Sequence, residues 1–165
     1  MDLEVIIGLE VHAQMNTKTK MFCSCSNDAF GKEANTTVCP ICMGHPGTLP
    51  VPNKAAIEKA IRVSKALKLT VNPHSHFDRK NYFYPDLPTG YQISQYKWPL
   101  SSNGQVTYNC AESGKKLTCR LLRLNLENDA GKLMHRSNTS LCDYNRAGTP
   151  LMEIVTEPDL RSALE

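Results

Sequence analysis

Apolar and polar residues alternate along the first part of the chain, between residues 3 and 15. One side of this segment carries Leu3, Val5, Ile7, Leu9 and Val11. The other side carries Glu4, Gly8, Glu10, His12 and Gln14. A period of two over this length predicts one β-strand through the whole segment, with Glu10 and His12 on its polar face.

The same alternation returns in the second half of the chain. Residues 105–111 and 116–126 flank the polar turn 112–115 and together predict a β-hairpin. Within residues 120–127, one face holds Leu122, Leu124 and Leu126, and the other holds Arg123, Asn125 and Glu127. A last strand is predicted over residues 151–157, where Pro158 ends it, with Glu153 and Glu157 pointing the same way.

One segment between these strands has a helical period. Asn53 is a typical N-cap, and residues 54–67 carry an apolar stripe made of Ile57, Ala60, Ile61 and Leu67. Asn72-Pro73 ends the element, and the pattern is that of an amphipathic helix that covers a sheet. Residues 161–165 lack a cap, so we interpret them as the beginning of another helix. Strands with a covering helix predict the α+β class.

Two segments have no period. Residues 21–52 are polar and rich in Cys, Gly, Pro and Asn, so they need something other than an apolar core to hold them. Residues 78–98 combine aromatic, proline and cationic side chains. Because ordering an irregular segment of this length is costly, such segments are often functional.

Composition narrows the class of protein. With 165 residues, 41% hydrophobic and 21% charged, the chain matches one globular domain with one core and excludes a disordered chain, a coiled coil or a fibre. No run approaches the ~18 apolar residues of a membrane span, and the first residues lack a basic leader, so we expect neither a membrane segment nor a signal peptide. The net charge of +3 permits contact with nucleic acid without requiring it.

Four of the seven cysteines form two close pairs. Cys23 and Cys25 are one residue apart, and Cys39 and Cys42 follow after a short loop with two residues between them. Each pair can reach one ion, so the pattern predicts a closed, structural four-thiolate Zn²⁺ site within residues 21–50. Four unrelated thiols or two disulfides are the alternatives. We interpret Cys110, Cys119 and Cys142 as ordinary buried thiols.

The predicted strands also gather acids. If they are neighbours in one sheet, a single face collects Glu10, His12, Glu127, Glu153 and, at its end, Glu157. Hard oxygen ligands with one imidazole suit Mg²⁺ or Mn²⁺. The alternative is that these acids form the solvated face of a half-exposed sheet, paired with Arg123 or Arg146. Strand adjacency is an assumption here, and without it the residues favour the second interpretation.

Long stretches of the sequence resemble the B subunits of aspartyl/glutamyl-tRNA amidotransferases, the GatB family. The resemblance covers nearly the whole chain in order and is carried by residues 8–12, 77–86, 91–95, 129–132, 143–151 and 153–159. It implies that residues 1–165 are the N-terminal part of a glutamine-synthetase-like catalytic cradle, with residues 21–50 as a zinc-binding insertion. The family's four-cysteine loop agrees with the spacing described above.

The resemblance also implies a reaction in two steps. ATP phosphorylates the side-chain carboxylate of Glu or Asp misacylated onto tRNA(Gln) or tRNA(Asn), and ammonia then displaces phosphate to leave the amide. The implied partners are the amidase (GatA-type) subunit, which releases the ammonia from glutamine, the small (GatC-type) subunit, and the misacylated tRNA. The implied cofactors are ATP, Mg²⁺ or Mn²⁺, and structural Zn²⁺. The implied compartment is the cytoplasm or an organellar matrix.

Residue by residue, the resemblance makes His12, Glu127 and Glu153 the ligands of the catalytic ion, with Glu10 close by. It assigns catalytic roles to Glu10, Lys80 and Glu127, and places Lys80 near the point where ammonia enters. The chain departs from the family at Thr89, where a Lys is common, at Asn125, where a His is common, and at Asn128, where a second Glu is common. In the family, the Lys at position 89 and the Glu at position 128 belong to a charged gate on the ammonia path. Neutral Thr89 and Asn128 therefore affect this gate.

Two other functions agree with the residues. The first is a non-catalytic, zinc-containing RNA-binding module, and the second is an ATP-dependent carboxylate–amine ligase that acts on a small molecule. No cysteine lies in a glutaminase motif and no amidase constellation is present, so we expect this chain alone to be inactive in amidation. The residues leave Glu-tRNA(Gln) and Asp-tRNA(Asn) both open as substrates.

Overall fold

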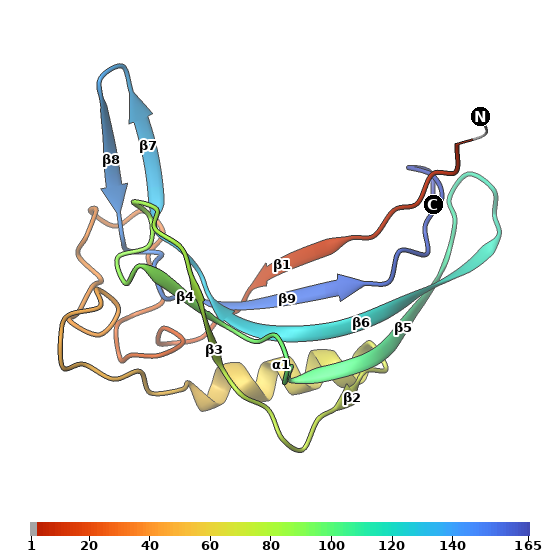
Figure 1. The fold of residues 1–165 in the computed structure, drawn as a ribbon, viewed down its shortest axis with the longest axis horizontal. Coiled ribbons are helices and arrows are strands. Elements are labelled where there is room, and N and C mark those ends of the chain that lie inside the picture. The colour runs from red at the N-terminus through yellow and green to blue at the C-terminus, as the bar shows by residue number, and fades with distance from the viewer. Residues whose placement is uncertain (1–2) are drawn as a thin grey trace.

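The computed structural model describes residues 3–165 and shows a sheet-rich fold with one helix (Figure 1). A five-stranded antiparallel sheet has the order β1-β9-β6-β5-β2. Its strands are β1 (Glu10–Gln14), β2 (Thr70–Val71), β5 (Ser101–Asn109), β6 (Lys116–Asn128) and β9 (Pro150–Thr156). The sheet class and the single covering helix agree with the predicted α+β fold.

Two hairpins stand beside this sheet. One pairs β3 (Asp78–Asn81) with β4 (Tyr91–Ser94), and β4 packs against β6. The other pairs β7 (Lys132–Arg136) with β8 (Thr139–Asp143) and projects from the body of the molecule (Figure 1). Within residues 3–165, no helix is long and apolar enough to cross a membrane.

The predicted helix is present as α1 (Lys54–Ala66), and Asn53 caps it. The Asn53 side-chain oxygen accepts hydrogen bonds from the backbone N–H groups of Ala55 and Ala56, which have no partner within the helix. The residues that face the sheet are small, namely Ala56, Ala60 and Ser64. The larger members of the predicted stripe pack around this contact and are only partly buried.

The core lies between α1 and the sheet, and β6 supplies its centre. Leu121, Leu124 and Leu126 are buried there, but Leu122 is 38% exposed. The prediction that Leu122 shares the face of Leu124 is wrong, because the register with β9 shifts between Leu121 and Arg123. Such a bulge adds one residue and turns the side chains before it to the opposite face.

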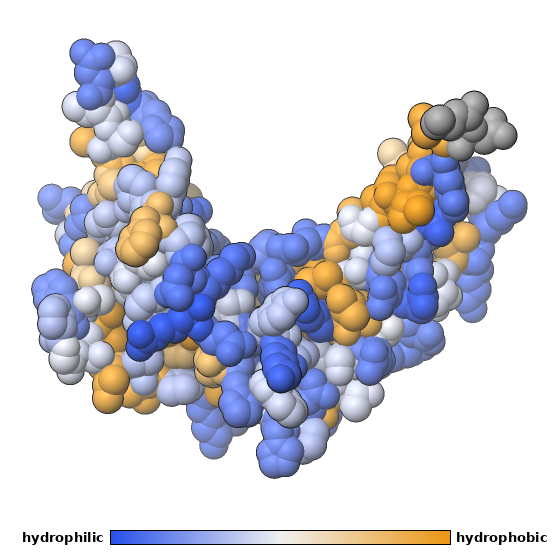
Figure 2. All heavy atoms as spheres, viewed as in Figure 1, coloured by the Kyte–Doolittle hydropathy of each residue, from blue (hydrophilic) through white to orange (hydrophobic). Residues whose placement is uncertain are grey.

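The first strand is shorter than predicted. β1 begins at Glu10, and the chain before it meets the C-terminal segment at an isolated bridge between Ile7 and Leu160 and at hydrogen bonds between Leu9 and Thr156. β1 is an edge strand whose single partner, β9, ends at Thr156, so residues 3–9 have no continuous ladder to join. The side chains of Leu3, Val5, Ile6 and Leu9 stay exposed, and Figure 2 shows apolar residues gathered on this arm.

The predicted hairpin and last strand are confirmed by β5, β6 and β9, with shifted ends. The helix expected at residues 161–165 is wrong, because these residues form turns. Arg161 there donates hydrogen bonds to the backbone oxygens of Pro158 and Leu160, which hold the segment in a compact turn.

Candidate functional site

The register of three neighbouring strands brings the predicted acids together. His12 of β1 lies opposite Glu153 of β9, and Glu153 in turn lies opposite Asn125 of β6. Because alternate residues point to opposite sides of a strand, these side chains lie on the face turned away from α1. Strand adjacency, which the sequence required as an assumption, is therefore correct for β1, β9 and β6.

Three carboxylates surround one nitrogen of the His12 ring. His12 Nε2 is 3.7 Å from Glu10 Oε1, 3.6 Å from Glu127 Oε2 and 3.7 Å from Glu153 Oε1. The Glu127 side chain is 2% exposed and that of Glu153 is 10% exposed, whereas Glu10 and His12 are accessible. We call these four residues the carboxylate cluster, which has two buried acids below and two accessible side chains at its mouth.

Without a bound cation, the negative charges of the carboxylate cluster repel one another and are unfavourable. Burial raises the pKa of Glu127, and a hydrogen bond shared with Glu153, together with that group's charge, raises the pKa of Glu10. Both shifts show that negative charge is disfavoured there. A divalent cation removes this penalty, and ligand atoms of Glu10, His12 and Glu153 lie within 4.8 Å of one another. The donor set of carboxylate oxygens and one imidazole fits Mg²⁺ or Mn²⁺.

Residues of β4 hold Glu127 in place. Ser94 donates a hydrogen bond from its hydroxyl to Glu127 Oε1. Gln92 Nε2 lies 3.3 Å from Glu127 Oε2 and also donates to the backbone oxygen of Asn128. On β6, Asn125 donates to Glu153 Oε2. These partners orient the acids, and groups that orient metal ligands matter nearly as much as the ligands themselves.

The sequence did not point to Gln92, Ser94 and Asn125 as supporting groups. The first two lie in residues 78–98, a segment that its composition marks as often functional, and their spacing of two on a short strand was the available signal for their roles. Gln95 was also missed. It is 3% exposed, and its side-chain oxygen accepts from the backbone N–H groups of Leu126 and Leu100, beyond the point where β5 pairs with β6.

Lys80 lies near the cluster. It is on β3, paired in register with Gln92 of β4, whose amide contacts Glu127. The positive charge of Lys80 opposes the rise in pKa of both Glu10 and Glu127. The fold thus brings together Glu10, Lys80 and Glu127, the three residues for which the sequence analysis predicts catalytic roles. Glu157 follows the end of β9, and its backbone N–H donates to the backbone oxygen of Arg120.

The four paired cysteines converge in the loop between β1 and α1. The Sγ atoms of Cys23, Cys25, Cys39 and Cys42 all lie within 4.8 Å of one another, and all seven cysteines are free thiols, so the two-disulfide alternative is not seen. A hydrogen bond from the Cys23 thiol lowers the pKa of Cys42 to about 5 and raises that of Cys23. Four thiols at this spacing fit a structural Zn²⁺.

A buried lysine lies against this cysteine cluster and was not predicted. Lys20 is 0% exposed, and its Nζ is 3.7 Å from Cys42 Sγ and 3.4 Å from the backbone oxygen of Tyr144. Its charge contributes to the lowered pKa of Cys42. Among the remaining cysteines, Cys110 and Cys119 are buried as predicted, whereas Cys142 on β8 is only half-buried.

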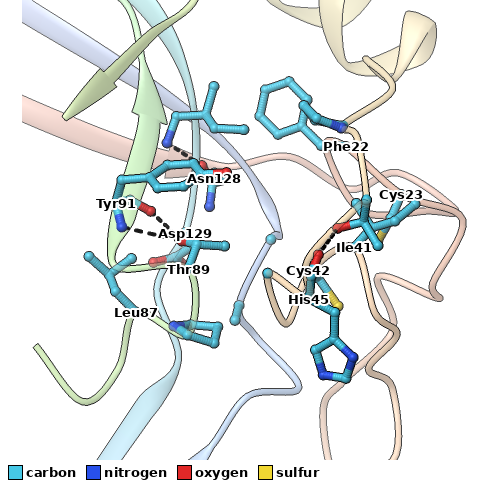
Figure 3. Close-up of a pocket in the computed structure, with 17 residues that line it drawn as sticks. Phe22, Cys23, Ile41, Cys42, His45, Leu87, Thr89, Tyr91, Asn128 and Asp129 are labelled. Atoms are coloured by element: carbon cyan, nitrogen blue, oxygen red, sulfur yellow. Dashed lines mark hydrogen bonds between the residues drawn. The ribbon is translucent and has the colours of Figure 1, made fainter. Parts of the chain in front are cut away.

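A cavity of about 90 Å³ separates the cysteine loop from β4 and the end of β6 (Figure 3). Thr89 and Asn128, the two positions that the sequence analysis connects with an ammonia gate, both line it. Each is committed to the backbone, because the Thr89 hydroxyl donates to the oxygen of Tyr91 and Asn128 Oδ1 accepts from Ile93 N–H at 2.8 Å. The two side chains are neutral and fixed.

The fold is an antiparallel sheet that carries a carboxylate cluster on its open face and a four-cysteine loop at one end. Residues 5–165 match the family described as the GatB/GatE catalytic domain, and the chain belongs to that family. The sequence is 57% identical over 164 residues to the B subunit of the aspartyl/glutamyl-tRNA(Asn/Gln) amidotransferase of Persephonella marina, covering 99% of this chain and 34% of that protein.

Other relatives carry the same name. The B subunit from Campylobacter curvus is 57% identical over 98% of this chain and 34% of its own length. That from Methanoregula boonei is 53% identical over 99% of this chain and 35% of its own length. The chain therefore spans about a third of the length of the curated relatives it matches. The resemblance noted in the sequence is confirmed at the level of the family.

Proposed function

We propose that this chain is the N-terminal part of the catalytic cradle of a tRNA-dependent amidotransferase subunit. The proposed reaction is ATP-dependent phosphorylation of Glu-tRNA(Gln) or Asp-tRNA(Asn), followed by amidation. The observation that carries the proposal is the carboxylate cluster, where three acids surround His12 Nε2 at 3.6–3.7 Å beside Lys80. Membership of the GatB/GatE family supports the same reaction.

In the first step, the γ-phosphoryl group of ATP passes to a side-chain carboxylate oxygen of the misacylated residue, and ADP leaves. In the second step, ammonia attacks the acyl carbon, the C–O bond to phosphate breaks, and phosphate and a proton are released. A divalent ion at the cluster would neutralise charge on the phosphoryl oxygens. His12, Glu127 and Glu153 would hold it, with Glu10 close by and Lys80 supplying a further cation.

The second step needs ammonia to arrive without competing water. The cavity beside Thr89 and Asn128 supports a delivery route at this end of the sheet, because the Gln92 amide contacts both Glu127 and the backbone oxygen of Asn128. In this chain the charged gate of the family is replaced by two neutral side chains held by the backbone. We therefore propose an uncharged constriction here, through which neutral ammonia passes without displacing an ion pair.

The remaining assignments follow from the same proposal. Residues 1–165 would be one piece of a glutamine-synthetase-like cradle, with residues 21–50 as its zinc-binding insertion. The amidase (GatA-type) and small (GatC-type) subunits would be its protein partners and misacylated tRNA its substrate. The protein would act in the cytoplasm or an organellar matrix. The chain alone would not amidate, since an amidase partner must release the ammonia.

The test is a phosphoryl-transfer assay with the full-length protein in complex with its amidase partners. With γ-labelled ATP and Mg²⁺, we expect release of labelled phosphate that depends on misacylated tRNA and is lost in Glu127→Gln. The matched control Glu58→Gln, which changes an acid of α1 on the other side of the sheet, should retain turnover. ATP turnover on a free amino acid without tRNA would favour a small-molecule ligase, and RNA binding without turnover would favour the binding module.

A further inference from the structure

The lysine that is buried against the cysteine loop has no acid to balance its charge. Lys20 is 0% exposed, so its ammonium group is removed from bulk water. Within residues 3–165, Lys20 forms no ion pair with a carboxylate. A buried charge is strongly unfavourable unless an opposite charge and hydrogen bonds compensate it. The proposed reaction gives Lys20 no role, so its burial requires another explanation.

The ammonium group of Lys20 has two partners, a sulfur atom and a carbonyl oxygen. Its Nζ donates to Cys42 Sγ at 3.7 Å and to the backbone oxygen of Tyr144 at 3.4 Å. The carbonyl oxygen is neutral, so it accepts a hydrogen bond without balancing the charge. Of the two partners, Cys42 is therefore the one that can carry the balancing negative charge.

A metal-bound thiolate supplies this charge, whereas a neutral thiol does not. Cysteines bind Zn²⁺ as thiolates, and four thiolates around one Zn²⁺ carry two excess negative charges. The four Sγ atoms of the cysteine loop, with that of Cys42 among them, lie within 4.8 Å of one another. The excess charge of a zinc-loaded site would thus lie beside the ammonium group of Lys20, and each would offset the cost of the other.

The main chain of Lys20 contacts the other pair of cysteines. Its backbone N–H donates to the backbone oxygen of Cys25 at 3.0 Å. Lys20 therefore contacts the first pair through its backbone and the second pair through its side chain. Cys42 Sγ also accepts from the backbone N–H of Cys39 at 3.2 Å, so two N–H donors converge on the same sulfur.

A glycine leaves room for the Lys20 side chain to reach Cys42. A Cβ atom at Gly148 would lie 3.2 Å from Lys20 Cδ and 3.6 Å from Cys42 Cβ. Gly148 has a φ of +94°, which favours glycine, and its backbone oxygen accepts from the N–H of Met21 at 2.8 Å. The turn at residues 144–148 therefore packs directly on Lys20.

We propose that Lys20 is a positioning residue of the zinc site, which donates to the Cys42 thiolate, balances part of the negative charge and joins the site to the turn at residues 144–148. This inference rests on the proposed zinc-binding insertion and extends it to a residue outside the four ligands. Loss of a group that hydrogen-bonds a metal ligand typically weakens metal binding about 10- to 100-fold. If Lys20 only filled space, an apolar side chain of the same length would serve equally well.

Zinc affinity separates these two roles. Lys20→Met keeps an unbranched side chain and removes the charge and the donors. In the full-length protein, competition with a chromophoric chelator should show that Lys20→Met binds zinc about 10- to 100-fold more weakly than the parent. The matched control Lys18→Met removes an exposed lysine two residues away and should bind zinc like the parent. Circular dichroism should show that both variants are folded.

Replacement of zinc by Co²⁺ gives a readout that space filling does not affect. A hydrogen bond to a thiolate lowers the energy of the sulfur electrons, so its loss moves the sulfur-to-cobalt charge-transfer band to longer wavelength. Lys20→Met should show this shift and retain the d–d bands of a tetrahedral four-thiolate site. Lys18→Met should keep the spectrum of the parent.

Hydrogen exchange tests the connection to the turn. In zinc-loaded Lys20→Met, the amides of residues 144–148 should exchange faster than in Lys18→Met, because the oxygen of Tyr144 loses the ammonium donor. Amides at the centre of β6 should stay equally protected in both variants.

A measurement on the unaltered protein does not depend on how the variants fold. An amine-acylating reagent, followed by mass spectrometry, should leave Lys20 unlabelled in the zinc-loaded protein and label it after treatment with a chelator. Lys18, which is exposed, should be labelled in both states.

The outcomes distinguish this inference from the proposals on which it rests. A parent protein that binds no zinc would overturn both the inference and the zinc-binding insertion. If the parent binds zinc, the inference alone is overturned by equal zinc affinity of Lys20→Met, by an unshifted cobalt band, or by labelling of Lys20 that does not depend on zinc. All of these measurements are independent of the phosphoryl-transfer assay.

Discussion

The charged residues of this molecule include two kinds. Some form ion pairs with other side chains, and others are acids whose charge a bound cation could neutralise. Arg120 and Asp159 are paired, with an Nη2–Oδ1 distance of 2.6 Å and a further bond from the Arg120 backbone N–H to Asp159 Oδ2. Glu127 and Glu153 are buried beside His12, and the hydrogen bonds they accept come from neutral hydroxyl and amide side chains. The first kind stabilises the fold directly, and the second stores a repulsion that a cation can relieve.

The Arg120–Asp159 pair should govern part of the acid limb of stability. Hydrogen bonds from Arg120 lower the pKa of Asp159 to about 2, against an ordinary value of 3.8. A lowered carboxyl pKa means that the unfolded state binds more protons in this range, so the pair stabilises above about pH 4 and its contribution is lost as pH falls toward 2. Urea unfolding between pH 2 and 6 should show this loss.

Asp159→Asn should be less stable than the parent at pH 6 and lose less stability on acidification. The control Glu58→Gln, which removes an exposed ion pair with Lys54, should keep the parent's pH dependence. Identical acid limbs for the parent and Asp159→Asn would show that the pair does not stabilise the fold.

At the scale of helices and strands, the sequence predicted the elements whose ends are set by neighbouring residues. The N-cap at Asn53, the hairpin turn at residues 112–115 and Pro158 act on their immediate neighbours, so α1, β5, β6 and β9 were predictable. The start of β1 depends on how far β9 extends, and the fate of Leu122 depends on a bulge. Gln92, Ser94 and Gln95 gain their roles only where β4 meets β6. Such features are set by tertiary contacts, which periodicity does not record.

The Asn53 cap connects α1 to the strand-to-loop junction as well as beginning the helix. Its side-chain nitrogen donates to the backbone oxygens of Thr19 and Lys20, while its oxygen caps the helix. Asn53→Ala should lower the free energy of unfolding by about 1–2 kcal/mol, since it loses the cap and leaves the two oxygens without this donor.

Asn53→Asp separates the two roles, because it retains the capping oxygen and removes the donor. We expect a loss between those of the parent and the alanine variant in urea unfolding. If Asn53→Asp were as unstable as Asn53→Ala, the cap itself would contribute nothing, contrary to this interpretation.

At the scale of the whole molecule, the cysteine loop and the carboxylate cluster are held in place by different parts of the chain. The loop joins the body through Met21 N–H, which donates to the oxygen of Gly148, and through Asn35, whose side chain bonds the backbone of Cys142 and Tyr144. The carboxylate cluster, in contrast, depends on β1, β9, β6 and β4. The two sites should therefore respond separately to the loss of metal.

Metal analysis of the purified chain should find about one zinc, bound by Cys23, Cys25, Cys39 and Cys42. Removing it with a chelator should speed amide hydrogen exchange in residues 21–50 and leave the amides of β6 and β9 protected. Cys39→Ser should lower the zinc content, and the control Cys142→Ser should not. Zinc that persists in Cys39→Ser, or a chain without zinc, would contradict a structural site.

The molecule has the shape of a curved sheet between two arms (Figure 1). The long strands β6 and β9 curve with α1 on their convex side, and the surface is hollowed on the other side between two arms (Figures 1 and 2). The carboxylate cluster lies on that open face, and the cavity of Figure 3 lies near the end of β6.

The account depends above all on the carboxylate cluster being a divalent-cation site, and Mn²⁺ titration followed by electron paramagnetic resonance tests this most directly. In the parent chain, one Mn²⁺ should bind and be displaced by Mg²⁺. Glu127→Gln and Glu153→Gln should each weaken Mn²⁺ binding about tenfold or more, as expected when one ligand of an oxygen-rich site is removed. Glu58→Gln should bind Mn²⁺ like the parent. Equal Mn²⁺ binding by all four proteins, or none by the parent, would contradict the account.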